Sequence, residues 1–202
     1  MEERFREMTH YFKGKKQNIG RKTLIPFTFR GLTLEFYSYS SLFSGTKVDL
    51  GTRLLLEEIE LPREGRILDI GCGYGVIGIT IAKLNPKLIV YMTDVNPLAV
   101  KITKYNAKIN DVLDRVVILQ GNLYEPVKNM RFNGIYSNPP LSAGMDIVKE
   151  IVLNAKKYLT NNGIAQFVLA RGGEYLFREA SKVYRDVKII RRKGYIILKL
   201  TP

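Results

Sequence analysis

The stretch 68-LDIGCGYGVIG-78 decides the fold of this 202-residue chain. It follows a short apolar run, residues 66–70, and it opens an apolar segment with helical spacing. Glycines let the backbone turn sharply and let a ligand approach without Cβ atoms in the way. A strand, a glycine loop and a helix in this order are typical of α/β folds that bind a cofactor.

The residue before the loop narrows the choice of cofactor. Gly73, Gly75 and Gly78 match the G-x-G-x-x-G pattern of dinucleotide-binding proteins, which is a weak signal alone. Asp69, however, lies two residues before Gly71, and a carboxylate there would repel a pyrophosphate. S-adenosylmethionine (SAM) carries an ammonium and a sulfonium, so the acid favours SAM over a dinucleotide.

The rest of the chain alternates strands and helices around this loop. Further strands are expected at residues 88–94, 116–120, 132–137 and 164–170, and helices between or after them at 97–110, 145–159 and 174–184. A terminal hairpin is expected from residues 187–192 and 195–200. The pattern predicts an α/β, Rossmann-like, seven-stranded and mostly parallel sheet, with helices on both faces and an antiparallel edge strand.

Charge is the first indication of a partner. The chain has 32 basic and 19 acidic residues, a net charge of +13. Between Lys13 and Arg30 there is no acid, and aromatic residues interleave with the cations, which suits nucleic acid; a merely basic, solvated surface is the alternative. The basic residues of this segment are Lys13, Lys15, Lys16, Arg21, Lys22 and Arg30.

Composition excludes several classes of protein. No apolar run reaches the roughly 18 residues of a membrane-spanning helix, and the stretch MEERFREMTHYFKGKK lacks the apolar core of a secretory signal. With a single cysteine, Cys72, and a single histidine, His10, neither an internal disulfide nor a zinc cluster is expected. A cytoplasmic location without membrane contact is therefore the default, and no metal site is predicted.

Polar residues stand where later strands end. Asp94 closes the second strand, and an acid there can accept both ribose hydroxyls of SAM or of a dinucleotide. Asn122 follows the third strand; a hydrogen bond to adenine and a plain turn residue after Gly121 are equally good interpretations. The fourth strand ends in Asn138-Pro139-Pro140, which alone would be read as a strand terminator.

The motifs 68-LDIGCGYG-75, 93-TDVN-96, 121-GNLYE-125 and 137-SNPP-140 together resemble those of class I SAM-dependent methyltransferases. The segment 42-LFSGTKVDLGTRLLLE-57 is similar to the F-S-x-x-x-x-D-x-G-(S/T)-x-L-L segment of the 16S ribosomal RNA guanine-N2 methyltransferases. Archaeal relatives of that family have a single catalytic domain, and the resemblance implies the same for this chain. Residues 1–48 are expected to form a basic extension, in which alternating apolar positions predict a β-hairpin (23–29 and 32–39), and residues 49–202 the methyltransferase domain. Asp49 is expected to cap a helix that runs to about Glu58.

The same resemblance implies a set of site residues. The expected SAM contacts are Asp69, Gly71, Cys72, Gly73, Tyr74, Gly75, Asp94, Val95, Asn122 and Leu123. The expected catalytic residues are Asn138, Pro139 and Pro140, and the expected substrate contacts are Phe43, Ser44 and Leu141, although core packing explains Phe43 equally well. The charge of the N-terminal segment, rather than the resemblance, adds Lys15, Lys16 and Arg21 as expected substrate contacts. Cys72 is expected to fill space and to contact SAM through its backbone rather than to act as a nucleophile.

Asn-Pro-Pro then acquires a chemical role. The lone pair of an exocyclic base amine is delocalised into the ring, so the amine must be held and oriented toward the methyl group. The Asn138 side-chain oxygen and the Pro139 carbonyl are predicted to accept its two N–H bonds, while the prolines add no competing donors.

The predicted function is SAM-dependent N-methylation of an exocyclic amine of an RNA base. Guanine N2 in ribosomal RNA or the small ribosomal subunit is the leading substrate, and a protein glutamine or DNA adenine the alternative. Leu141 stands where those alternatives typically have tyrosine, which counts against both. An oxidoreductase and a non-catalytic RNA-binding module are the remaining possibilities, and Asp69 with Asn138 counts against them.

Overall fold

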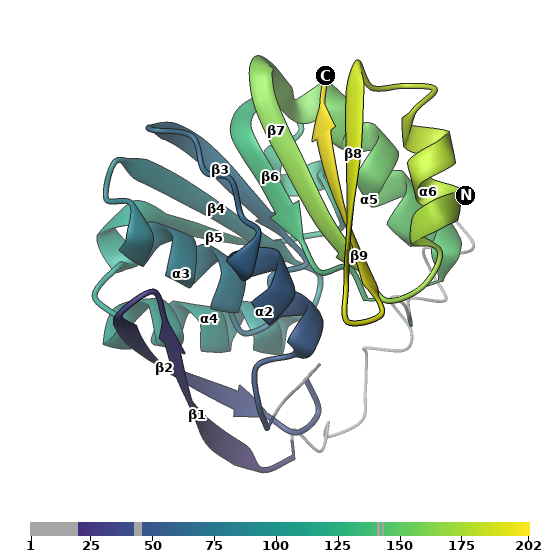
Figure 1. Ribbon diagram of the computed structural model, residues 1–202. Helices are drawn as coiled ribbons and strands as arrows, with labels where there is room; N and C mark the ends of the chain where they lie inside the picture. Colours follow the sequence, from purple (N-terminus) through teal and green to yellow (C-terminus); the bar gives the residue numbers. More distant parts are fainter. Residues whose placement is uncertain (1–19, 43–45, 141, 143) are drawn as a thin grey trace, which may run out of the picture.

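A seven-stranded sheet forms the centre of the molecule, with strand order β5-β4-β3-β6-β7-β9-β8 (Figure 1). The computed structural model describes residues 20–42, 46–140, 142 and 144–202. The strands are β3 (Gly65–Ile70), β4 (Leu88–Asp94), β5 (Val116–Gln120), β6 (Phe132–Ser137), β7 (Leu159–Leu169), β8 (Asp186–Arg192) and β9 (Tyr195–Thr201). β9 runs antiparallel to β7 and β8, and the pairings among β3 to β7 are parallel, which confirms the predicted sheet.

Helices cover both faces of the sheet, as predicted (Figure 1). On one face lie α2 (Leu50–Glu57), α3 (Val76–Leu84) and α4 (Pro97–Ile109), and on the other lie α5 (Met145–Tyr158) and α6 (Gly173–Ala180). Two short 3-10 helices, η1 (Leu113–Arg115) and η2 (Glu125–Val127), precede and follow β5. Each face buries its own hydrophobic cluster, so the sheet is apolar on both sides, as parallel sheets require.

Two elements differ in length from the sequence expectation. Strand β7 begins at Leu159, which pairs with Phe132, and a register shift follows before Ile164 pairs with Gly134. The polar residues 160–163 between them carry a turn signal, which hides the start of the strand. Helix α6 ends at Ala180 rather than near residue 184.

Strands β3 and β6 mark the reversal of the strand order. From β3 the chain adds β4 and β5 on one side, and then returns to add β6 on the other side of β3. Open α/β sheets bind their ligands at such a point, beyond the carboxyl ends of the strands. The loops after β3 and β6 carry the glycines and Asn-Pro-Pro, so the topology brings the two main motifs together.

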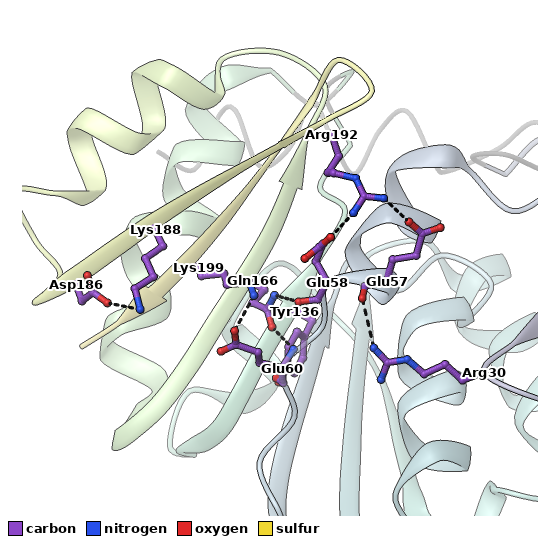
Figure 2. Close-up of polar contacts among 10 residues, drawn as sticks. All are labelled: Arg30, Glu57, Glu58, Glu60, Tyr136, Gln166, Asp186, Lys188, Arg192 and Lys199. Atoms are coloured by element: carbon purple, nitrogen blue, oxygen red, sulfur yellow. Dashed lines mark hydrogen bonds and ion pairs between the residues drawn. The ribbon is translucent and has the colours of Figure 1, made fainter.

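Helix α2 is fixed to the sheet at its C-terminal end (Figure 2). Buried Gln166 of β7 donates to the Glu58 carbonyl at 3.0 Å and accepts from the Glu60 amide at 2.6 Å. Tyr136 of β6 donates to the Glu60 carbonyl at 2.5 Å. Arg192 of β8 adds ion pairs to Glu57 and Glu58. Buried and charge-assisted bonds of this kind hold an element in one position.

The N-terminal hairpin packs against α4. Its strands, β1 (Lys22–Phe29) and β2 (Leu32–Tyr39), join through a turn at Arg30 and Gly31, whose φ angles are 46° and 79°. The alternate apolar side chains Ile25, Phe27, Leu34 and Phe36 are buried in the cluster formed with α2, α3 and α4. The hairpin of the predicted extension therefore shares its core with the rest of the domain.

One asparagine of α4 and the asparagine that caps its C-terminal end bond the backbone of β2 as a neighbouring strand would. Asn106 accepts from the Tyr37 amide and donates to the Tyr37 carbonyl, both at 2.8 Å, and also donates to the Tyr74 carbonyl at 2.8 Å. Asn110 accepts from the Glu35 amide at 3.1 Å and donates to the Glu35 carbonyl at 2.7 Å. The hairpin and the glycine loop are thus tied to one helix.

Replacing Asn106 by alanine is expected to lower the free energy of unfolding by about 3 kcal/mol, because it removes three hydrogen bonds that tie the backbone of Tyr37 and Tyr74 to α4. Urea unfolding at one pH measures the loss. Lys101→Ala on the exposed side of the same helix is the control, with a change of about 0.5 kcal/mol or less. Equal losses in the two variants would contradict the proposed role of Asn106.

Candidate active site

A cavity of about 380 Å³ lies at the carboxyl ends of β3, β4, β5 and β6. The loops after these strands supply most of its wall, and the first residues of α2, the end of the hairpin and two residues of α5 complete it. The strand ends and the loops after them contribute Ile70, Gly71, Cys72, Gly73, Tyr74, Thr93, Asp94, Val95, Asn96, Gly121, Asn122, Leu123, Asn138 and Pro140. The first turns of α3 and α4 contribute Val76, Ile77 and Ala99. From the other elements come Ser41, Leu42, Asp49, Thr52, Ile147 and Ile151.

The glycine loop exposes its backbone to this cavity. Gly71 and Gly73 have φ angles of 71° and 59°, and a Cβ atom on either would meet no atom within 4 Å. Gly75 has a φ of 93°, and a Cβ there would lie 2.8 Å from Ile79 Cδ1. The loop is held from below because the Gly71 and Cys72 amides donate to the Thr93 carbonyl at 2.8 and 3.0 Å. A side chain in the first two positions would fill space that a ligand can use.

Asp69 lies behind the loop and does not line the cavity. Its Oδ2 accepts from the Gly78 amide at 2.9 Å, which fixes the loop against the first turn of α3. Complete burial raises the pKa of Asp69 to about 7, the Gly78 bond opposes this, and the charge of Asp94 adds to it. The sequence suggested an acid that faces a cationic ligand, whereas the structure places this carboxyl under the loop.

Asp94 lines the cavity and organises two of its loops. Its Oδ2 accepts from the Gly73 amide at 2.9 Å and its Oδ1 from the Asn96 amide at 2.8 Å. Burial raises its pKa, and these amide bonds partly offset the effect. Each carboxylate oxygen has a further lone pair, so the group can still accept hydroxyls from a ligand in the cavity.

Five other predicted cofactor contacts line the cavity, whereas the predicted contact Gly75 does not. Cys72 is buried beside Thr103, with its Sγ 4.0 Å from the Thr103 hydroxyl, and burial raises its thiol pKa, which disfavours the nucleophilic thiolate. Tyr74 packs edge-on against Phe36 and donates its hydroxyl to the Lys47 carbonyl at 3.2 Å. The remaining predicted contacts on the cavity wall are Val95, Asn122 and Leu123.

Asn138 is half-buried and bonded at the cavity wall, not a solvent-facing residue at the end of a strand. Its side-chain nitrogen donates to Asp49 Oδ2 at 2.8 Å and to Thr52 Oγ1 at 3.0 Å. Pro140 lines the cavity beside it, whereas Pro139 is buried and does not. The sequence predicted Asp49 as a helix cap, which it is, but gave no sign that Asp49 and Thr52 bond Asn138.

The predicted substrate contacts are placed only in part. Phe43, Ser44, Leu141, Lys15 and Lys16 lie outside the described residues. Arg21 is exposed at the open end of the hairpin, where its amide donates to Ser40 Oγ at 3.1 Å. Ser41, the next residue in the chain after Ser40, lines the cavity, whereas Arg21 does not.

Comparisons with known proteins agree with this fold and site. Residues 33–199 match the family model of the methyltransferase small domain. The uncharacterised protein YbxB of Bacillus subtilis (strain 168) is 33% identical over 195 residues, which span 94% of this chain and 96% of that protein.

Solved structures share the fold at lower identity. The Thermus thermophilus 16S rRNA N2 G1207 methyltransferase (RsmC), in complex with AdoMet and guanosine, is 21% identical with a TM-score of 0.77. The match covers 88% of this chain and only half (50%) of that chain. A Pyrococcus furiosus methyltransferase has 19% identity and a TM-score of 0.68 over 83% of this chain and 88% of its own. A ribosomal protein L11 methylase from Lactobacillus delbrueckii subsp. bulgaricus has 18% identity and a TM-score of 0.67. This match covers 89% of this chain and 98% of that chain.

The chain therefore belongs to the methyltransferase small-domain family. It is a methyltransferase with the class I, Rossmann-like fold, as the motifs predicted, and the cofactor of this family is SAM. The cavity fits that cofactor, because bare glycine backbone and the Asp94 carboxylate face the same space. Within the described residues no helix is long and apolar enough to cross a bilayer, and no group of three potential metal ligands occurs.

Proposed function

We propose that this methyltransferase acts on an exocyclic amine of an RNA base, with guanine N2 in ribosomal RNA as the leading substrate. The observation that carries the proposal is Asn138 on the wall of the cavity, next to the glycine loop. Its amide nitrogen is occupied by Asp49 and Thr52, which leaves the amide oxygen for a donor in the cavity.

That oxygen suits a conjugated amine. SAM, when bound, supplies a methyl group on a sulfonium and thus the driving force. The chain has to hold the amine in line and draw its N–H hydrogens into the right directions. An acceptor fixed in advance favours the geometry in which the nitrogen lone pair is free to react. The Asn138 oxygen is the first such acceptor, and the Pro139 carbonyl is proposed as the second.

The surface next to the cavity supports RNA as the partner. Lys22 of β1 sits over two rings, 4.1 Å from the centre of Tyr37 and 4.6 Å from that of Tyr105. Helix α4 contains no acid and exposes three lysines, and its first turn reaches the cavity wall at Ala99. We define this cation-rich surface, the α4 face, by Lys22, Tyr37, Lys101, Lys104, Tyr105 and Lys108. Cations beside exposed rings hold phosphates and stack on bases.

Ribosomal RNA is the leading class of RNA for a separate reason. The structure with the TM-score of 0.77 is a 16S rRNA methyltransferase that holds guanosine, and this chain shares its fold over 88% of its own length. Half of that chain has no counterpart here, so its nucleotide position is not carried over. Guanine N2 enters our proposal through this likeness and through the F-S…D…G-T segment.

Neutralising the α4 face should weaken RNA binding and its dependence on salt. In the variant Lys101→Ala, Lys104→Ala, Lys108→Ala, the slope of log K against log salt is expected to fall by roughly 2, at about 0.7 per lost phosphate contact. Fluorescence anisotropy with single-stranded RNA at several salt concentrations measures the slope. The variant Lys157→Ala, Arg178→Ala, Arg185→Ala removes the same charge from exposed positions on or beside α5 and α6 and should keep it. Equal slopes in the two variants would remove the α4 face from the proposal.

The substrate itself is tested by transfer of a tritiated methyl group. Purified protein and tritiated SAM are incubated with total RNA and with assembled ribosomal subunits from a strain that lacks the gene, and the labelled nucleotide is mapped. Label on the N2 of a guanine is the expected result. Label on a glutamine of a subunit protein would support that alternative substrate instead, and label on an RNA oxygen would overturn the amine assignment.

A further inference from the structure

The N-terminal end of helix α2 meets the Asn-Pro-Pro loop at one side chain. We infer that Asp49 and Thr52 are positioning residues that decide which end of the Asn138 amide faces the cavity. Asp49 Oδ2 lies 2.8 Å and Thr52 Oγ1 3.0 Å from the Asn138 nitrogen. The inference rests on the proposed function, since it concerns the acceptor that holds the substrate amine.

The orientation of the Asn138 amide decides whether a donor or an acceptor faces the cavity. One end of the group is an NH₂ with two donors, the other is an oxygen that only accepts, and the two ends have nearly the same shape. A substrate amine needs the oxygen. If the Asn138 amide were turned over, its NH₂ would face the cavity. The substrate amine would then meet a donor instead of an acceptor, and no hydrogen bond would form. The rate of methyl transfer therefore depends on the fraction of molecules with the oxygen toward the cavity.

The Asp49 carboxylate supplies the preference. It accepts and never donates while ionised, so it bonds the NH₂ end of Asn138 and repels the oxygen end. Thr52 takes the second hydrogen of the same NH₂. A hydrogen bond to a charged group corresponds to a preference of roughly ten- to a hundredfold over the turned amide. Both donors of Asn138 are used, and its oxygen is the end that remains for the cavity.

Asp49 can set this orientation because it cannot move away. Its Oδ2 also accepts from the Thr52 amide at 3.2 Å, as the N-cap of α2. The other end of α2 and the residues that follow it are fixed to the sheet by Gln166 and Tyr136 (Figure 2). The position of the carboxylate is thus determined at both ends of the helix, while Asn138 is fixed by the end of β6.

Asp49→Ser tests the inference with little change in structure. Serine caps a helix as well as aspartate does, so α2 should persist. Its hydroxyl can both donate and accept, so it does not favour either end of the Asn138 amide and the preference is lost. We expect kcat to fall roughly ten- to a hundredfold, with the Kd for SAM within a few fold of wild type and Tm nearly unchanged. Asp186→Asn, which removes the same charge at an exposed site on β8, is the control and should keep full activity.

A reciprocal exchange separates orientation from general disruption. Asn138→Asp alone places two carboxylates against each other and should be inactive at neutral pH. In the double variant Asp49→Asn, Asn138→Asp, the amide at 49 can donate to one carboxylate oxygen at 138, and the other oxygen faces the cavity as an acceptor. The double variant is expected to transfer methyl at least about tenfold faster than Asn138→Asp, which is a coupling that independent effects do not produce.

The outcomes distinguish this inference from the function on which it rests. Full activity in Asp49→Ser, or a double variant no faster than Asn138→Asp, would overturn the inference and leave the amine methyltransferase intact. A wild-type protein that methylates no amine in the tritium assay would overturn both. A Kd for SAM raised in step with the loss of kcat would show Asp49 to be a cofactor contact rather than a positioning residue.

Discussion

Asn138→Ala is expected to lower the rate of methyl transfer by about a thousandfold and to leave the affinity for SAM within a few fold of wild type. The amide oxygen on the cavity wall is the acceptor that orients the amine, and alanine provides none. The bonds that shape the glycine loop do not involve this residue, since they join Asp69 to Gly78 and Asp94 to Gly73. Single-turnover transfer of a tritiated methyl group measures the rate, and calorimetric titration measures the affinity.

A second variant, Asp94→Ala, should lose affinity for SAM and keep most of its rate of methyl transfer. Asp94→Ala removes the carboxylate that faces the cavity and holds the Gly73 amide, so SAM affinity should fall while transfer at saturating SAM is largely retained. Together the two variants separate residues needed for SAM binding from residues needed for methyl transfer. Loss of SAM binding by Asn138→Ala with intact chemistry would reverse the roles given to the two loops and would rule out Asn138 as the acceptor.

Strong periodicity made most of the fold predictable. The strands at residues 88–94, 116–120 and 132–137 are apolar runs with clear ends, and all three occur with those bounds. The start of β7 was missed because residues 160–163 look like a turn, yet tertiary pairing with β6 extends the strand through them. The docking of the hairpin depends on Asn106 and Asn110, and an asparagine on a helix gives no sign that it will bond a strand about 70 residues earlier in the chain.

The candidate site was predictable to the level of loops but not of contacts. Because parallel strands end at one edge of the sheet, the residues after β3, β4, β5 and β6 had to converge, and they do. It was harder to predict which residues at the end of a strand point into the cavity. Ile70 lines the cavity while its neighbour Asp69 does not, since successive residues of a strand point to opposite faces. The bond between Asn138 and Asp49 joins residues 89 positions apart, and no local pattern encodes it.

The buried carboxyl behind the glycine loop should make the stability of the protein depend on pH. Burial raises the pKa of Asp69 from 3.8 to about 7. Between these values the folded protein holds a proton that the unfolded chain has lost, so the free energy of unfolding should fall as pH rises through this window. A separation of about 3 pH units corresponds to about 4 kcal/mol, which is a large fraction of the stability of a domain.

Asp69→Asn isolates this contribution, because an amide keeps an acceptor for the Gly78 amide and does not titrate. Urea unfolding of both proteins from pH 4 to pH 8 gives the comparison. The wild type should gain stability relative to the variant as pH is lowered, by about 4 kcal/mol over the range, whereas other groups such as Asp94 titrate in both proteins and cancel. Parallel stability curves would mean that Asp69 stays ionised behind the loop. The acid would then act as a fixed negative charge beneath the cavity, as the sequence first suggested, and not as a neutral brace for the glycines.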